Sequence, residues 1–224
     1  MKPTVIMTQT QPYQNSQVNI YHIPLLETVK CPFDQQLLER TYDWLVFSSK
    51  NAVKYFIPYL QDVQVGKIAA IGIKTREFCE EQGIDVDFVP DDFSQEGFLA
   101  QFVIEPHASI LLPSSAQARP KLAKELGNRG YQVEKIDLYD VVVNEASVKA
   151  VYDMTLSHKI DAITFASSSA VRALFDRYQN IQCQTLHVIG VPTQKILAEY
   201  GYEGIVADTQ TLDAMIDKIL EKGF

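Results

Sequence analysis

Residues 43–83 of this chain are repeated, without a gap, in residues 161–201. The two segments share 12 identities in 41 aligned positions, whereas ordinary composition would give roughly one match in fifteen to twenty. The segment DWLVFSSKNAV, for example, aligns with DAITFASSSAV at an offset of 118 positions. The similarity indicates an internal duplication, which predicts two similar structural units.

Each copy has the pattern strand–turn–helix twice in succession. Leu45–Phe47 and Ile163–Phe165 are short apolar runs, typical of strands that are buried on both faces of a parallel sheet. A second apolar run in each copy ends in glycine, and Thr75 or Thr193 follows near the start of a helix. A hydroxyl at such a place can satisfy free backbone N–H groups, so both threonines are expected to support the start of a helix.

The rest of the chain continues the alternation of strands and helices. Ile110–Leu112 and Val133–Leu138 are predicted strands, and Gln117–Gly127 is the helix between them. Val5–Met7 and Val18–Ile23 resemble these two strands, but the first strands lie 105 positions apart and the second strands 115. The N-terminal copy therefore lacks about ten residues, and we expect its helix to be stunted or replaced by a turn.

This alternation predicts an α/β fold with parallel sheets that carry helices on both sides. We expect two similar flavodoxin-like or Rossmann-like domains, with chain crossings near residues 25–29 and 141–146. The first domain would then combine residues 1–26 with 144–224, and the second would hold residues 28–142.

Composition excludes several classes of function. The formal net charge is −8 with only 20 basic residues, which disfavours nucleic-acid binding. Cys31, Cys79 and Cys183 are odd in number and far apart, so neither a disulfide framework nor a metal site is expected, and the four histidines are expected to be structural. No apolar run approaches the roughly 20 residues of a membrane span, and the first apolar stretch is too short for a signal peptide. We therefore expect a cytoplasmic protein without membrane contact.

Candidate binding residues collect where the predicted strands end. In open parallel sheets, ligands bind beyond the carboxyl ends of the strands, toward which helix N-termini point. Each residue there could simply be a cap or a turn, but the matching sets in two copies favour a shared cleft that holds a large anion. The predicted binding residues are Ser48, Ser49, Lys50, Asn51, Gly72, Thr75, Ser94, Ser114, Ser167, Ser168, Ser169, Gly190 and Thr193.

Other sites have weaker support from the sequence. Neither a GxGxxG nor a GxxxxGK[ST] motif occurs, so a nucleotide-dependent transferase lacks its usual fingerprint, and no GxSxG elbow is present. A non-catalytic binding or sensor module for an anionic metabolite stays open. Tyr139 lies where a predicted strand meets a domain crossing, where it is either a structural anchor or a functional hydroxyl.

Five motifs, in order along almost the whole chain, resemble the uroporphyrinogen-III synthase family: LVFSSKNAV, AIGIKT, FSQEGF, the pair Leu138-Tyr139, and VIGVPT. The resemblance implies two α/β domains joined by a two-stranded linker, with a cleft between them and no metal or organic cofactor. It also implies a monomeric enzyme of haem biosynthesis. This enzyme converts the linear tetrapyrrole hydroxymethylbilane to uroporphyrinogen III, with inversion of ring D and loss of water.

The resemblance also assigns roles to single residues. Tyr139 matches the family's tyrosine and is the candidate acid or orienting hydroxyl, and Thr75 and Thr193 match its cleft threonines, which implies substrate contacts. Two positions depart from the family's pattern: Pro192 replaces the first of two threonines, and Gln9 stands where an arginine is common.

The negative charge opposes the approach of a polycarboxylate substrate. Helix N-termini can still bind carboxylates, each contributing about 0.3–1 kcal/mol in exposed settings. Local positive charge could come from Lys50, Lys74, Arg119 and Arg172.

Overall fold

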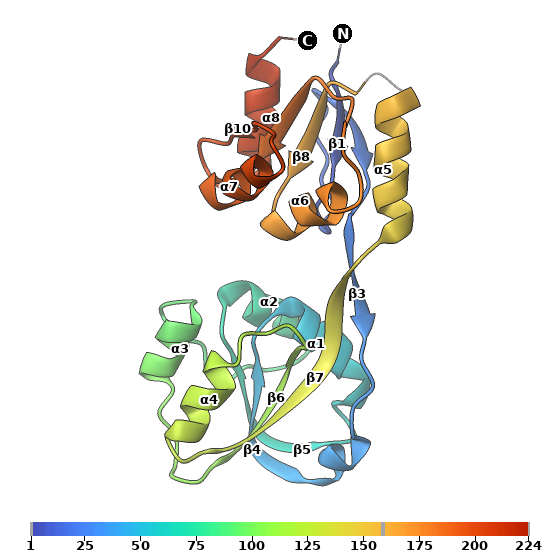
Figure 1. The fold of residues 1–224 in the computed structure, drawn as a ribbon. Coiled ribbons are helices and arrows are strands. Elements are labelled where there is room, and N and C mark those ends of the chain that lie inside the picture. Colours follow the sequence, from blue (N-terminus) through green and yellow to red (C-terminus); the bar gives the residue numbers. More distant parts are fainter. Residues whose placement is uncertain (1, 158–159, 224) are drawn as a thin grey trace. The chain divides into compact units, whose positions relative to one another are not determined.

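The structure, a computed structural model, describes residues 2–157 and 160–223 (Figure 1). His158, one of the histidines expected to be structural, lies outside the described residues. The chain forms two compact units: unit 1 comprises Met1–Glu27 with Val142–Phe224, and unit 2 comprises Thr28–Val141. Each unit has its own five-stranded sheet.

Unit 1 has a parallel sheet in the order β10-β9-β8-β1-β2. Successive residues of its strands face opposite sides of the sheet. Ile163 and Phe165 pack with α5, α6 and α7 on one side, whereas Ala162 packs with α8 on the other. The elements are β1 (Thr4–Met7), β2 (Asn19–His22), α5 (Glu145–Ser157), β8 (Ala162–Phe165), α6 (Ser168–Phe175), β9 (Thr185–Val188), α7 (Val191–Glu199), β10 (Ile205–Val206) and α8 (Leu212–Glu221).

Unit 2 has a sheet in the order β3-β7-β6-β4-β5, in which β4 to β7 are parallel. Phe47 faces the core beneath α1 and α2, and its neighbour Val46 faces α3 and α4. The elements are β3 (Leu26–Lys30), a 3-10 helix (Gln35–Glu39), β4 (Thr41–Phe47), α1 (Lys50–Phe56), a 3-10 turn (Ile57–Tyr59), β5 (Gln64–Ala70), α2 (Ile73–Glu81), α3 (Gln95–Gln101), β6 (Ser109–Ser115), α4 (Lys121–Asn128) and β7 (Gln132–Val143). The predicted α/β fold with two parallel sheets is confirmed.

Two strands continue across the boundary between the units. β3 and β7 are neighbours in the sheet of unit 2, and they run antiparallel, since Cys31 N donates to Leu138 O and Asn144 N to Leu25 O. Each of these hydrogen bonds is 2.9 Å long. The chain thus passes the boundary as a hydrogen-bonded pair of strands.

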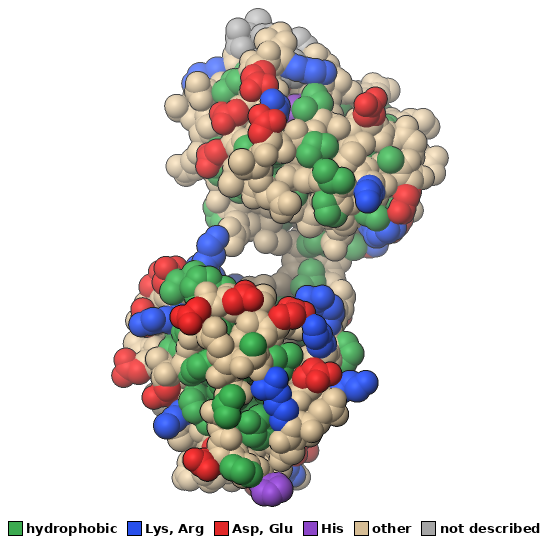
Figure 2. Space-filling model, turned by 90° about the vertical axis from the view of Figure 1, so that its left-hand side faces the viewer, with side chains coloured by type: hydrophobic (Ala, Val, Ile, Leu, Met, Phe, Trp, Pro, Cys, Tyr) green, Lys and Arg blue, Asp and Glu red, His purple; other side chains and the backbone are tan. Residues whose placement is uncertain are grey.

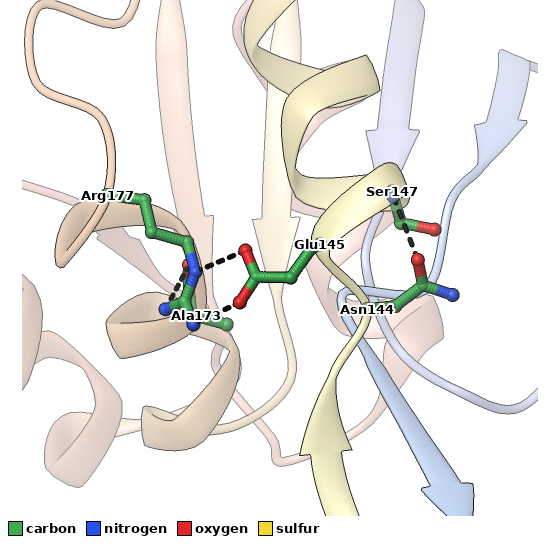
Figure 3. A network of polar contacts seen from close by, with 5 residues as sticks. All are labelled: Asn144, Glu145, Ser147, Ala173 and Arg177. Carbon is green, nitrogen blue, oxygen red and sulfur yellow. Dashed lines mark hydrogen bonds and ion pairs between the residues drawn. The ribbon is translucent and has the colours of Figure 1, made fainter.

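Just beyond this strand pair, an ion pair within unit 1 fixes the start of α5 (Figure 3). Arg177 donates to both carboxylate oxygens of Glu145, at 2.5 and 2.7 Å, and to Ala173 O near the end of α6. The bond from Arg177 lowers the pKa of the Glu145 carboxyl. Asn144 Oδ1 accepts from Ser147 N at 2.9 Å and so caps the same helix. The bidentate geometry specifies how α5 and α6 meet.

Three details differ from the sequence-based prediction. The helix expected from Gln117 begins only at Lys121, because Pro120 disfavours helical geometry at the preceding residue. β2 covers Asn19–His22, shorter than the predicted Val18–Ile23. Val5 pairs with Ile20 as Ile110 pairs with Val133, so the counterpart of Val133 is Ile20, 113 positions earlier. The first strands of the two copies lie 105 positions apart and the second strands 113, so the N-terminal copy lacks eight residues between its strands rather than about ten.

The expected loss of the first crossover helix is confirmed. Between β1 and β2 the chain forms only bends and a turn. Hydrogen bonds of side chains hold this segment: Thr8 Oγ1 donates to Thr164 O at 2.6 Å, and Asn15 Oδ1 accepts from Gln17 N at 2.8 Å.

We predict that Gly97→Ala destabilises unit 2, although alanine is favoured over glycine by about 1 kcal/mol inside a helix. A Cβ on Gly97 would lie 2.2 Å from the backbone oxygen of Asp92, which is far too close. Gly127 in α4 is the matched control, since a Cβ there meets nothing within 4 Å. Urea unfolding should show a lower midpoint for Gly97→Ala and a slightly higher one for Gly127→Ala. A midpoint for Gly97→Ala at or above that of the wild type would contradict the packing.

We predict that unit 1 loses stability as the pH falls from about 6.5 to 4. His187 on β9 is fully buried, and its burial lowers the pKa to about 4. In the unfolded chain, His187 takes up a proton near its ordinary pKa of about 6.5. The neutral, buried imidazole therefore contributes fully to the free energy of unfolding above about pH 6.5. This contribution, up to about 3 kcal/mol, is lost as the pH falls toward 4.

His187→Leu should flatten this dependence in urea unfolding measured at a series of pH values. The control is His107→Asn, because His107 is exposed and has a positive φ of 64°, which asparagine tolerates. Equal pH slopes for the wild type and His187→Leu would refute the assignment.

Candidate functional site

Tyr139 lies at the carboxyl edge of the sheet of unit 2. It is paired with Ser115 at the end of β6, and 5% of its surface is exposed. Its hydroxyl is 3.0 Å from Ser49 Oγ, just beyond the end of β4. Its ring stacks on that of Tyr55 from α1, with centroids 5.2 Å apart and planes 9° from parallel. β7 and β4 lie on either side of β6, so the carboxyl edge of the sheet brings Tyr139 and Ser49 together.

Ser49 and Ser167, which occupy equivalent positions in the two copies, both cap helices. Ser49 Oγ accepts from Ala52 N at 3.1 Å, and Ser167 Oγ accepts from Ala170 N at 3.2 Å. Each satisfies one of the free N–H groups at the start of α1 or α6. The capping interpretation therefore holds for both serines, and it leaves room for a further role.

Gly72 and Gly190 start α2 and α7 without any side-chain cap. The expectation that Thr75 and Thr193 provide these caps is wrong, because both occupy the third helical position, one turn too late for a capping side chain. Both threonines are buried, at 5% and 4% exposure. In the part of the chain that the structure describes, neither hydroxyl has a hydrogen-bond partner.

The uncapped helix starts leave backbone N–H groups free, and the two copies differ in their number. At α2 the amides of Ile73 and Lys74 have no acceptor among the described residues, whereas Thr75 N bonds to Gly72 O. At α7 the second helical residue is Pro192, which has no N–H. Two donors thus stand at the first helix and one at the second, a ready arrangement for anionic groups.

Ser114 adds a buried hydroxyl at the same edge of unit 2. It lies near the end of β6 with 2% exposure, and its Oγ has no hydrogen-bond partner among the described residues. An unpaired buried hydroxyl is costly, so a ligand or a water molecule would compensate for it. The Ser94 hydroxyl, in contrast, has a partner: its Oγ caps α3 by accepting from Gly97 N at 2.9 Å.

The remaining predicted binding residues make few side-chain contacts. Ser168 Oγ donates to Pro192 O at 3.4 Å, and the ammonium of Lys50 lies 5.7 Å from the centroid of the Phe78 ring. Ser48, Asn51 and Ser169 make no side-chain hydrogen bond to any described residue.

The basic residues expected to attract an anion differ in their pairing. Of the four basic residues expected to help, Arg172 is paired with Glu199 at 3.3 Å. Lys50, Lys74 and Arg119 form no ion pair within the described residues. Figure 2 shows acidic and basic side chains interspersed on the visible face, without a continuous basic surface. An anion could therefore meet unpaired basic side chains as well as backbone donors.

Two surface pockets lie at the opposite, amino ends of the strands. One of about 420 Å³ is lined by Thr185 and Ile205, which begin β9 and β10. The other, of about 490 Å³, is lined by Thr41 and Gly66 near the starts of β4 and β5. Neither contains a predicted site residue, and the helix N-termini point away from both, so we assign the site to the carboxyl edges.

No group of three or more His, Cys, Asp or Glu side chains that could hold a metal ion occurs among residues 2–157 and 160–223. Burial raises the pKa of the Cys79 and Cys183 thiols to about 11, which disfavours the thiolate form at neutral pH. Within the same described ranges, no helix is long and apolar enough to span a membrane.

A family model described as uroporphyrinogen-III synthase HemD matches residues 10–217. The chain belongs to this family. The family resemblance of the sequence motifs is thereby confirmed.

Individual relatives agree with this assignment. The porphyrin biosynthesis protein HemD of Ruminiclostridium josui is 29% identical to this chain. The alignment covers 89% of this chain but only 43% of the length of that protein. The chloroplastic uroporphyrinogen-III synthase of Oryza sativa subsp. japonica is 26% identical over 91% of this chain and 72% of its own. The crystal structure of uroporphyrinogen-III synthetase from Helicobacter pylori 26695 has the same fold, with a TM-score of 0.68 at 18% identity, over 99% of this chain and 100% of that one.

Sequence reasoning missed Tyr55 and Thr28. The Tyr55 hydroxyl donates to Thr28 O at 2.7 Å and lies 2.9 Å from Thr28 Oγ1, which anchors the ring that stacks on Tyr139. A signal was available in the repeat, because Ala173 occupies the position of Tyr55 in the second copy. An aromatic ring at only one of two equivalent positions favours a role specific to the copy that carries it.

Gln9, which stands where the family often has arginine, contributes amide groups to the carboxyl end of β1. Its Nε2 donates to Gln11 O at 3.1 Å, and its Oε1 is buried without a partner among the described residues. Its backbone oxygen lies 2.7 Å from His22 Nε2. The Gln9 side chain is neutral and so lacks the positive charge that an arginine would carry at this position.

Proposed function

We propose that this protein is a uroporphyrinogen-III synthase, which converts hydroxymethylbilane to uroporphyrinogen III in haem biosynthesis. The observation that carries the proposal is the family match over residues 10–217. The arrangement of Tyr139, Thr75 and Thr193 at carboxyl edges of parallel sheets supports it, because that is where ligands bind in such folds.

The carboxylates of the substrate would lie at the helix N-termini on the carboxyl edge of each sheet. The amides of Ile73, Lys74 and Val191 are the available donors, and the hydroxyls of Thr75 and Thr193 lie in the same first turns. Each helix N-terminus contributes about 0.3–1 kcal/mol to binding an anion in an exposed setting. Several such contacts together would offset the repulsion expected from a net charge of −8.

In the proposed reaction, Tyr139 either donates a proton to the terminal hydroxyl of the bilane or orients that hydroxyl. The C–O bond breaks, water leaves, and a cationic azafulvene remains, which polar groups at the site stabilise. Attack by the substituted carbon of the last pyrrole gives a spiro intermediate, and its rearrangement inverts ring D before the ring closes. Holding the bilane curled would supply much of the rate, because correct positioning removes an entropic barrier.

We further propose that the enzyme is monomeric and cytoplasmic and that it uses neither a metal nor an organic cofactor. The chemistry requires only proton transfer and positioning, for which side-chain hydroxyls and backbone amides suffice. The three free cysteines at Cys31, Cys79 and Cys183 agree with a reducing compartment.

The protein should produce the type III isomer from freshly generated hydroxymethylbilane. The products would be oxidised to porphyrins and separated by chromatography. Spontaneous closure yields only the symmetric type I isomer, so type I alone would refute the synthase proposal. In that case, binding of the bilane without turnover would favour a non-catalytic binding module.

Tyr139→Phe should lower kcat by at least about tenfold, and by about 10²-fold or more if the hydroxyl donates the proton. The fold should persist, since the ring and its stacking on Tyr55 remain. Tyr131→Phe is the matched control, because among the described residues the Tyr131 hydroxyl bonds only to the backbone of Ile104, remote from the predicted site residues. An unchanged kcat for Tyr139→Phe would make Tyr139 a structural anchor.

A further inference from the structure

We propose that Ser49 is a positioning residue that acts through Tyr139, and that it supports the tyrosine oxygen when the hydroxyl gives up its proton. This inference rests on the proposed function for its catalytic part. The hydrogen bond itself, at 3.0 Å between Ser49 Oγ and Tyr139 Oη, does not depend on it.

The capping bond of Ser49 fixes the position of its hydroxyl oxygen. Ser49 Oγ accepts from Ala52 N at 3.1 Å, which leaves the Oγ proton and one lone pair for Tyr139. Donation from a backbone N–H polarises the serine and makes it a better donor to the next oxygen in the chain. Among the described residues, Ser49 is the only hydrogen-bond partner of the Tyr139 hydroxyl.

The ring of Tyr139 is held independently of its hydroxyl. Tyr55 stacks on it at a centroid distance of 5.2 Å, and the Tyr55 hydroxyl is anchored to Thr28 on β3, the strand beside β7. A ring held by stacking and a hydroxyl held by Ser49 define a single position for the phenol. Preorganisation of this kind is what a group that transfers a proton needs.

The duplication shows that capping alone does not explain this arrangement. Ser167 caps α6 with backbone angles within a few degrees of those of Ser49, φ −160° against −162° and ψ 155° against 159°. Ser167 Oγ has no side-chain partner among the described residues, and Ala173 stands in place of Tyr55. Among the described residues, the shared cap therefore carries the tyrosine cluster in one copy only.

The proton and the electrons balance in the assigned step. The Oη–H bond of Tyr139 breaks, and its proton goes to the terminal hydroxyl of the bilane, which leaves as water with the electron pair of the C–O bond. The phenolate oxygen then accepts the Ser49 Oγ–H, while Ser49 Oγ still accepts from Ala52 N. Return of the proton released on ring closure restores the tyrosine.

The contact is tested first without turnover, by NMR of protein that carries ¹³C at Cζ of its 11 tyrosines. The signal that disappears in Tyr139→Phe belongs to Tyr139. We expect Ser49→Ala to shift this signal and Ser167→Ala, which loses the same kind of cap, to leave it in place. A signal that does not move in Ser49→Ala overturns the contact.

The catalytic part is tested by a double-mutant cycle of Ser49→Ala and Tyr139→Phe on kcat. We expect Ser49→Ala to lower kcat about 5- to 10-fold in the wild-type background, as for the loss of a hydrogen bond to a developing charge, with KM little changed. In the Tyr139→Phe background, the same change should lower kcat less than about twofold. Equal effects in both backgrounds overturn the inference, because Ser49 would then act independently of Tyr139.

The two proposals fail in different ways. Formation of type I isomer alone by the wild type refutes the proposed function. Formation of type III with additive kinetic effects refutes only the role of Ser49.

Discussion

The backbone N–H groups at the starts of the helices are the constraint on which the site depends. A parallel sheet requires each strand to be followed by a crossover, and in both units the helix that follows a strand begins near the strand's carboxyl end. The first N–H groups of each helix lack intrahelical partners, so they need a side chain, water or a ligand. Ser49 and Ser167 meet this need internally, whereas Gly72 and Gly190 leave it unmet. The N-termini of α2 and α7 are therefore available to bind an anion.

The two copies use this shared framework unequally. Unit 2 carries Tyr139 and Tyr55 around its capping serine, and two free amides at the start of α2. Among the described residues of unit 1, no such ring pair surrounds Ser167, and Pro192 removes one donor from α7. The linear substrate that we propose has two different ends, and these differences between the copies could distinguish one end from the other.

Burial explains several polar groups that the sequence alone presents as ordinary. His187, Ser114 and Thr75 are all buried, but their surroundings differ. His187 stays neutral on β9, bonded to Thr185 within the core of unit 1. Ser114 and Thr75 lie at a carboxyl edge, where an unpartnered hydroxyl is within reach of a ligand.

The sequence by itself determined the duplication, the α/β class and the family, because apolar periodicity and repeated motifs depend on local order along the chain. It also indicated Tyr139, Ser49 and the glycine turns as parts of a site. Tertiary structure decided which of them meet: the bond from Ser49 to Tyr139 spans 90 positions, and the anchor of Tyr55 on Thr28 spans 27. It also decided that Thr75 and Thr193 are not caps and that Ile20 is the counterpart of Val133, since the position within a helix and the register of a sheet are set by hydrogen bonding. Contacts of this kind arise from packing across strands, and no pattern of neighbouring residues encodes them.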